Sequence, residues 1–202
     1  MKKLFVKIGL LTFITAGLLG TSCKKKDDPI VDPEVDPEVT KFDVTSSCTE
    51  AEVKIVNVEP SNDGVGTTTW TKNNVYVLKG MVFVNSGQTL TIEAGTIIKG
   101  ADGSGADASA LVVARGGKIM AEGTKEEPIV FTSEADGVIR DVDGVLCASG
   151  NLSNTEQGLW GGLIILGNSP LNTIPSIQNI EGIPTSETRG KYGGSDAADN
   201  SG

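Results

Sequence analysis

A chain of 202 residues has room for one domain and its leader segments, and 26 glycines with only three methionines favour a turn-rich β protein over a helical bundle. The net charge of -9 argues against nucleic acid as a partner, because a polyanion is bound by an excess of Lys and Arg. The absence of histidine excludes Ser-His-Asp catalysis, Cys-His catalysis and His-ligated zinc within these residues.

Residues 1–22 have the features of an export signal. Three lysines lie near its start, and residues 8–19 form an apolar stretch that is too short to span a bilayer, which takes about 20 residues. The residues just before Cys23, Leu-Leu-Gly-Thr-Ser, resemble the lipobox of bacterial lipoproteins, although Gly20 stands where that motif usually has leucine. The resemblance implies that Cys23 is acylated. Cleavage of an ordinary secretory signal near Ser22 is the alternative.

The charged stretch that follows, Lys-Lys-Lys-Asp-Asp at residues 24–28, bears on the location of the protein. It resembles the sequence that directs lipoproteins of Bacteroidetes to the outer leaflet of the outer membrane. The resemblance implies a lipid-anchored protein of the outer membrane that is exposed on the cell surface. Residues 23–41 as a whole are predicted to form a tether, because Val-Asp-Pro-Glu occurs twice in a row and its prolines and acidic groups favour an extended segment.

Residues 42–69 are predicted to form an N-terminal cap region. Residues 53–58 contain enough β-branched side chains for a strand, and the turn-forming residues 60–64 end it. A solenoid needs such a cap, because open strand edges and an exposed apolar end promote aggregation.

An internal repeat predicts the architecture of the next part of the chain. Residues 82–93 align with residues 111–122, and each copy consists of a β-branched strand, a corner containing Gly, a second short strand and an acidic residue. A third apolar run completes each copy, at residues 96–98 and 128–132. Three short strands per turn predict a solenoid, because no single turn can bury its own apolar face.

Polar insertions interrupt this pattern. They lie at residues 101–109 and 134–157, strand character returns at residues 159–168, and the remaining polar stretch carries almost no strand pattern. Within the stacked strands, Val112 and Ile129 are expected to be buried, so that an Asp at either position would unfold the domain.

Four stretches of this part of the chain together resemble one family. They are residues 90–96, 110–119, 128–133 and 158–163. On their basis Trp70–Gly202 resembles the start of a group of Bacteroidetes cell-surface lipoproteins. The resemblance implies an all-β fold, a right-handed parallel β-helix over residues 70–202. It also implies further coils after Gly202, so we expect the domain to be incomplete at its C-terminus.

No catalytic constellation is visible, so neither a catalytic residue nor a cofactor is predicted. Asp141 and Asp143 beside Arg140 offer charged groups of the kind with which some β-helix enzymes cleave acidic polysaccharides, but they lie in an insertion and not on a repeat strand. We therefore prefer to interpret them as a solvated acidic loop. The same two acids with Asp136 are weak candidates for a calcium site, because no closing Glu stands at the required spacing. No resident metal is predicted.

Two tryptophans and one charged corner have both a structural and a functional interpretation. Trp70 and Trp160 could stack on sugar rings, but packing is the preferred interpretation for both. Trp160 stands beside two glycines, which are expected to make room for a large ring from an adjacent coil. Arg115 and Lys118 flank a Gly-Gly corner and are expected to keep the outside of that corner soluble.

Cys48 and Cys147 remain as an even pair once Cys23 is acylated. In an exported chain such a pair is compatible with a disulfide, which would join the cap region to the second insertion. The sequence leaves open whether the two residues meet.

The anchor, the tether and the solenoid together favour a non-enzymatic surface lipoprotein with a structural or adhesive role, or one that contacts glycans. Its expected partners are the membrane, through the lipid anchor, and glycans or proteins of a host or cell surface. The alternative is a polysaccharide-degrading lyase or hydrolase whose active site lies in further C-terminal coils.

Overall fold

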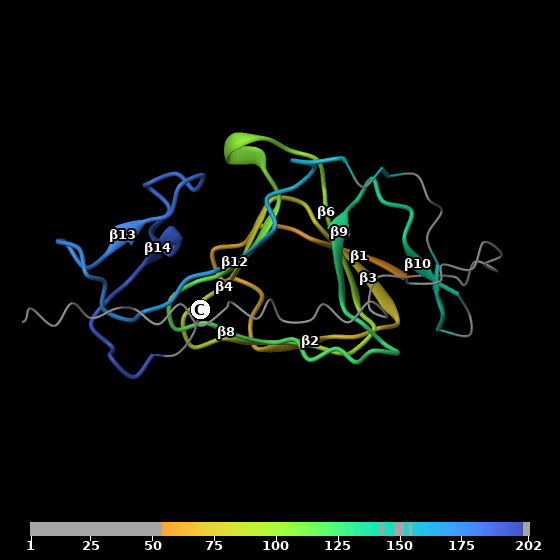
Figure 1. Cartoon of the computed structure of the whole chain (residues 1–202), viewed down its shortest axis with the longest axis horizontal. Helices are drawn as coiled ribbons and strands as arrows, with labels where there is room; N and C mark the ends of the chain where they lie inside the picture. Colours follow the sequence, from red (N-terminus) through yellow and green to blue (C-terminus); the bar gives the residue numbers. More distant parts are fainter. Residues whose placement is uncertain (1–53, 142–143, 148–151, 154, 200–202) are drawn as a thin grey trace, which may run out of the picture. The chain divides into compact units, whose positions relative to one another are not determined.

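The computed structural model describes residues 54–141, 144–147, 152–153 and 155–199 (Figure 1). The chain divides into two units, Met1–Phe42 and Asp43–Gly202, and all described residues belong to the second. The predicted export signal and tether therefore lie outside the described residues, as do Cys23, Cys48 and Asp143. Within the described ranges, no helix has the length and apolar character needed to cross a membrane.

Three parallel β-sheets make up the described domain, and corners join them (Figure 1). Sheet 1 contains β1 (Lys54–Val58), β3 (Asn74–Leu78), β6 (Ile97–Gly100) and β9 (Val130–Ser133). Sheet 2 contains β2 (Thr68–Trp70), β5 (Thr89–Ile92) and β8 (Lys118–Met120). Sheet 3 contains β4 (Met81–Val84), β7 (Ala110–Val113) and β12 (Leu163–Ile165). The chain visits sheets 1, 3 and 2 in turn, and this winding is the predicted parallel β-helix.

The register of the strands confirms the internal repeat. Val82 pairs with Leu111 in sheet 3, and Leu90 pairs with Ile119 in sheet 2. The number of residues between the two copies is larger than in a coil without an insertion, however. In sheet 1, Val75 pairs with Ile97 only 22 residues later. The first insertion lies within the longer repeat and accounts for the difference.

Both long insertions leave the β-helix at the same corner, between sheet 1 and sheet 3. The first, between β6 and β7, contains a short 3-10 helix at Gly105–Asp107. The second, between β9 and β12, contains the antiparallel pair of β10 (Ile139–Arg140) and β11 (Leu146–Cys147). The corner between sheet 3 and sheet 2 is short by contrast, and takes residues 85–88 in one coil and 114–117 in the next.

The interior of the β-helix is filled by the side chains of alternate residues in each strand, because successive side chains of a strand point to opposite faces of the sheet. Its fully buried members include Leu78, Leu90, Ile98 and Leu111. Trp70 belongs to the same cluster and stacks on Tyr76, with ring centroids 4.6 Å apart and an angle of 12° between the rings. The packing interpretation of Trp70 is thereby confirmed.

The outer face of sheet 1 is also apolar, and the second insertion covers it. Val75, Val77 and Ile97 point out of the β-helix and are buried against Val138, with Leu146 packed beside them. Figure 1 shows β10 beside sheet 1, as these contacts require. The insertion is therefore part of the hydrophobic core.

A second covering element, the strap (residues 178–192), lies on the outer face of sheet 3. It contains the antiparallel pair of β13 (Gln178–Asn179) and β14 (Lys191–Tyr192), and its Ile183 packs in one cluster with Phe83 and Val112. Val112 is buried as predicted, but under the strap and not inside the β-helix. Ile129, predicted to be buried, is only half-buried directly before β9.

Candidate functional site

A groove of about 490 Å³ lies where β9 passes into the second insertion. We call it the Trp160 groove. Its lining combines two aromatic rings with carboxylate, hydroxyl and amide side chains, namely Trp160, Phe131, Asp136, Glu156, Thr132, Ser133, Ser153 and Gln157. Such a lining offers an apolar surface for the face of a ligand ring and several polar groups that could fix its orientation.

Trp160 is held in the groove by a glycine of the neighbouring coil. A Cβ atom built on Gly100 would lie 2.6 Å from an atom of the Trp160 ring, so only glycine leaves room for the indole. The two glycines after Trp160 were predicted to make room for a large ring from an adjacent coil, and that prediction was wrong: Gly161 approaches the backbone of Ser109 instead. Trp160 packs against the core and is half-buried, so it has both a structural role and a face in the groove.

The polar floor of the groove is fixed by hydrogen bonds around Asp136. The Thr132 hydroxyl donates to one carboxylate oxygen of Asp136 at 2.7 Å, and the backbone N–H of Val138 donates to the other at 3.2 Å. Lys99 donates from Nζ to the backbone carbonyl of Asp136 at 2.5 Å. Burial lowers the pKa of the Lys99 ammonium, against the attraction of Asp136 and Glu134, which raises it.

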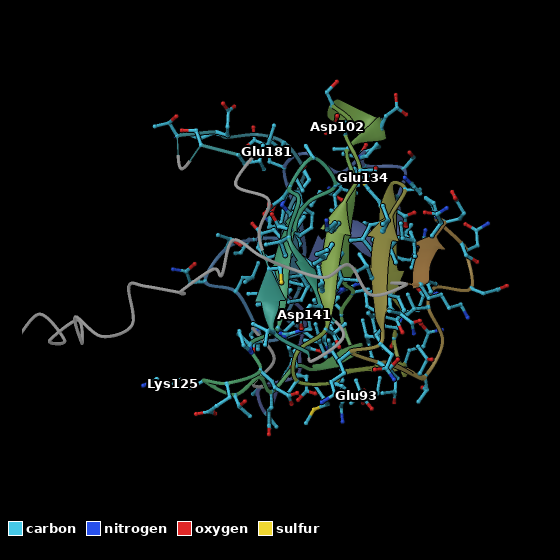
Figure 2. The ribbon with its side chains drawn as sticks, turned by 90° about the vertical axis from the view of Figure 1, so that its right-hand side faces the viewer. Glu93, Asp102, Lys125, Glu134, Asp141 and Glu181 are labelled. Carbon is cyan, nitrogen blue, oxygen red and sulfur yellow. The ribbon has the colours of Figure 1, made fainter. Side chains whose placement is uncertain are left out.

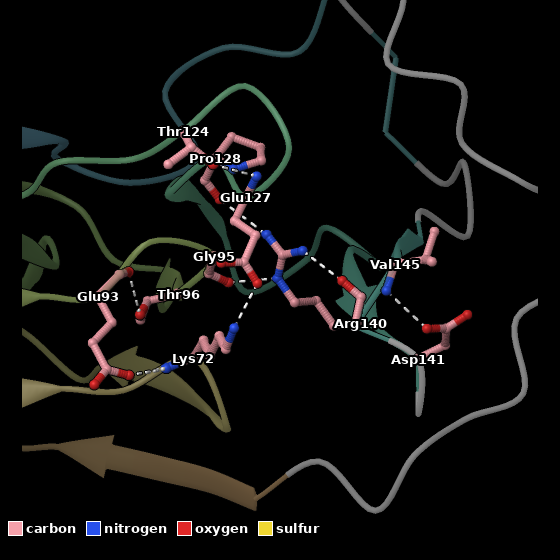
Figure 3. A network of polar contacts seen from close by, with 11 residues as sticks. Lys72, Glu93, Gly95, Thr96, Thr124, Glu127, Pro128, Arg140, Asp141 and Val145 are labelled. Atoms are coloured by element: carbon pink, nitrogen blue, oxygen red, sulfur yellow. Dashed lines mark hydrogen bonds and ion pairs between the residues drawn. The ribbon is translucent and has the colours of Figure 1, made fainter.

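Arg140 is buried and clamps the second insertion onto the β-helix (Figure 3). Its guanidinium donates to three backbone carbonyls, those of Gly95, Pro128 and Gly144. Burial lowers the pKa of Arg140, and the nearby Glu127 raises it. Arg140, next to the acidic residues that were interpreted as a solvated loop, is therefore a buried structural residue. The loop sequence alone does not reveal that the carbonyls of Gly95 and Pro128 lie beside it.

Two of the three acidic candidates for a metal site, Asp136 and Asp141, lie among the described residues. One carboxylate oxygen of Asp141 accepts a hydrogen bond from the backbone N–H of Val145 at 2.8 Å, which closes the turn between β10 and β11 (Figure 3). Asp136 is engaged in the Trp160 groove, and Asp143 lies outside the described residues. Figure 2 shows Glu93, Asp141 and Glu181 spread around the ribbon. In the part of the chain that the structure describes, no group of three metal-ligating side chains occurs.

Cys147 is buried in β11 and is disulfide-bonded. The other two cysteines of the chain, Cys23 and Cys48, lie outside the described residues. The pairing of Cys147 with Cys48 therefore stays a prediction.

Arg115 does more than keep its corner soluble. Its Nη1 donates to the backbone carbonyl of Gly193 at 2.8 Å, so it fastens the chain just beyond the strap to the corner after β7. Lys118, at the start of β8, is exposed as expected.

A larger cleft, of about 660 Å³, lies between β12 and the strap. Its lining combines four aliphatic side chains and two glycines with Tyr192, Glu181, Asn179 and Ser169 as the polar contributors. The Trp160 groove has the smaller volume but more polar groups around an aromatic ring, which makes it the better candidate for a ligand rich in hydroxyls.

Comparison with known proteins identifies a family but not a close relative. No curated protein and no solved structure matches this chain. Residues 62–202 match the model of a pectate-lyase-like β-helix domain. The match covers every strand of the three sheets except β1, the Trp160 groove and the strap, which is more than half of the chain, and the protein therefore belongs to the family of pectate-lyase-like β-helix domains.

Proposed function

We propose that this protein contacts glycans and that the Trp160 groove receives a neutral saccharide. The observation that carries this proposal is the half-buried indole of Trp160 beside hydroxyl, amide and carboxylate groups. A sugar ring presents C–H groups on its face, which favour an aromatic surface, and hydroxyls on its rim, which pair with such polar groups. Membership of a pectate-lyase-like family supports a carbohydrate ligand in general.

The charge of the groove supports a neutral sugar over an acidic one. Asp136 and Glu156 line it, whereas no Lys or Arg stands among its described lining residues. The Lys99 ammonium lies nearby but donates to the carbonyl of Asp136. With a net charge of -9 on the whole chain, a polyuronate would be repelled both at long range and in the groove.

A polysaccharide-degrading enzyme is the second candidate, and the two carboxylates of the groove favour it. Glycoside hydrolysis requires a proton donor and a second carboxylate. Asp136 is poorly placed as the donor, because both of its oxygens already accept hydrogen bonds. We therefore place the enzymatic alternative second.

Fluorescence of the two tryptophans tests the glycan proposal. The chain has only Trp70 and Trp160, so the variant Trp70→Phe reports on Trp160 alone. Neutral oligosaccharides are expected to shift the emission of this variant to shorter wavelengths as the indole is covered. Trp160→Phe is expected to bind the same sugars about three- to tenfold more weakly by calorimetry, the range that an aromatic contact contributes.

Two controls decide how this result is interpreted. The variant Glu156→Ala removes an exposed side chain of the groove and leaves Trp160 in place. If this variant binds sugars more weakly and keeps its melting temperature, the groove has a role in binding and not only in packing. Tighter binding of a polyuronate than of neutral sugars would contradict the proposal. Formation of an unsaturated sugar product, seen by its ultraviolet absorbance, would favour the lyase instead.

We further propose that Cys23 carries the lipid anchor of this protein and that residues 24–28 direct it to the cell surface. The support is the resemblance of the sequence around Cys23 to a lipobox and of the following charged stretch to an export sequence. A single acyl chain binds a membrane only marginally, whereas several chains hold a protein stably. An anchored and tethered β-helix would present its grooves to glycans outside the cell.

The variant Cys23→Ala is expected to leave the membrane fraction or to accumulate as an unprocessed precursor. The matched control is Cys48→Ala, which removes a different cysteine and should stay with the membranes. Protease treatment of intact cells then tests exposure on the surface. If Cys23→Ala fractionates with membranes as a processed protein, the anchor is elsewhere and this proposal is wrong.

A further inference from the structure

A cleft of about 360 Å³ lies between two stacked corners of the β-helix and the strap. We propose that this cleft, the Arg115 cleft, binds a tetrahedral oxyanion, the sulfate or phosphate ester group of a ligand. Its polar lining residues are Ser86, Arg115, Asn168, Thr188 and Arg189. The Arg115 cleft is separate from the Trp160 groove, and binding in the cleft does not require a ligand in that groove.

The stacking of coils places Ser86 and Arg115 next to each other. The backbone N–H of Ala114 donates to the carbonyl of Val84, which continues the hydrogen-bond ladder of sheet 3 into the corner. The backbone N–H of Gly87 donates to the carbonyl of Gly116 at 2.8 Å. Gly116 has a φ of +77°, and a Cβ atom there would lie 2.6 Å from the Ser86 hydroxyl. Glycine at this position therefore permits the turn and keeps the serine hydroxyl unobstructed.

The uncompensated positive charge of the cleft belongs to Arg115. Arg189 is fixed by Glu187, to which its Nε and Nη2 donate at 2.8 and 2.6 Å, and by its position 4.0 Å over the Phe83 ring. The hydrogen bond from Arg189 lowers the pKa of Glu187. None of the ion pairs among the described residues involves Arg115.

Arg115 also has hydrogen-bond donors beyond those that the fold uses. A guanidinium carries five N–H groups, and the bond from Nη1 to the carbonyl of Gly193 takes one of them. Charge-assisted hydrogen bonds from such a group are stronger than neutral ones, and they favour phosphate-like and carboxylate oxygens. The whole chain has a net charge of -9, so attraction of an anion to Arg115 would be specific to this cleft and not the effect of a generally positive surface.

The arrangement of the donors favours a tetrahedral group over a planar carboxylate. One corner supplies the Ser86 hydroxyl, and the next corner supplies the Arg115 guanidinium. The Thr188 hydroxyl comes from the strap, and Asn168 adds an amide from the segment after β12. A sulfate or phosphate ester has three terminal oxygens for donors on three sides, whereas a carboxylate has two oxygens in one plane.

Calorimetry with four related sugars tests this site in the whole protein. Glucose 6-sulfate and glucose 6-phosphate are expected to bind, and the stronger of the two identifies the ester. Glucose and glucuronate are expected to bind at least about tenfold more weakly. Arg115→Gln should weaken the binding of the preferred ester by about tenfold or more, as the loss of charge-assisted hydrogen bonds predicts.

Three variants separate specific binding from general effects. Lys118→Gln removes the same charge from an exposed neighbour that does not line the cleft, and should leave binding unchanged. Thr188→Val removes an exposed hydroxyl of the strap without touching the bond to Gly193, and should weaken binding about threefold if one neutral hydrogen bond is lost. Trp160→Phe should bind the ester as the wild type does, whatever its effect on neutral sugars. Equal losses in Lys118→Gln and Arg115→Gln, or equal affinity for glucuronate and the esters, would overturn the proposal.

Discussion

Replacing Leu111 with alanine is expected to lower the free energy of unfolding by about 2–5 kcal/mol, the cost of removing a large aliphatic side chain from a closed core. Leu111 is fully buried inside the β-helix, and it stacks between Val82 of one coil and Leu163 of the next. Denaturant unfolding of the purified protein measures the effect. Most single domains are stable by only about 5–15 kcal/mol, so this one change removes a large share of the total.

Leu163 is the matched control, because it occupies the same column of the sheet one coil later. It is 39% exposed, whereas Leu111 is 0% exposed. Leu163→Ala should therefore cost less than half as much as Leu111→Ala. If both variants lowered the free energy of unfolding equally, Leu163 would be as buried in solution as Leu111, and the prediction would be wrong.

Replacing Arg140 with alanine is expected to destabilise the protein by roughly 3 kcal/mol, because three backbone carbonyls lose a charged donor in a buried place. The carbonyls of Gly95 and Pro128 belong to the coils and that of Gly144 to the insertion itself, so two of the three lost bonds fall on the contact between the second insertion and the coils. Limited proteolysis should accordingly cut that insertion sooner than in the wild type. Arg140→Lys keeps the charge but not the planar fork, and an intermediate loss of stability is expected.

The control for Arg140 lies in the same polar network (Figure 3). Lys72 pairs with Glu127 at 2.5 Å, but both side chains are more than 40% exposed. An exposed ion pair contributes about 0–1 kcal/mol, so Lys72→Ala should change stability little. If Arg140→Ala is as mild as Lys72→Ala, water reaches the three carbonyls and the clamp is not buried.

The stacked strands were predictable because their pattern is local. Residues 82–93 and 111–122 carry the same order of strand, glycine corner and strand, and the pairs of Val82 with Leu111 and of Leu90 with Ile119 follow directly from that alignment. Each turn needs the next one to bury its apolar side chains, so such a repeat leaves few alternative folds.

The coverings of sheets 1 and 3 were not predictable in the same way. Both covering segments are mostly polar, and each is attached by a few apolar residues such as Val138 and Ile183. The sequence therefore indicates loops, and nothing in it says which sheet they cover. Val112 shows the consequence: its burial was expected, but the strap that buries it was not.

The Trp160 groove depends on contacts between distant parts of the chain. The glycine that accommodates Trp160 is Gly100, a whole coil away, and Asp136 reaches the same groove from the end of β9. Aromatic and acidic residues at such separations carry no shared motif. A sequence signal existed only for the glycine next to a tryptophan, and it indicated the wrong glycine.

Both insertions leave the β-helix at the corner between sheet 1 and sheet 3, so the length of the loops can change there without a change in the stacked strands. Loop closure becomes more costly only slowly with length, by about 0.6 kcal/mol for each doubling, so that corner can carry longer or shorter excursions while the ladders stay in register. The corner between sheet 3 and sheet 2 takes four residues in both coils, 85–88 and 114–117, and shows no such variation in length. Variation among β-helices of this kind should therefore be largest along the edge between sheet 1 and sheet 3. An exchanged loop there would alter ligand choice, and it would keep the melting temperature only if it also kept apolar contacts such as those of Val138 with sheet 1.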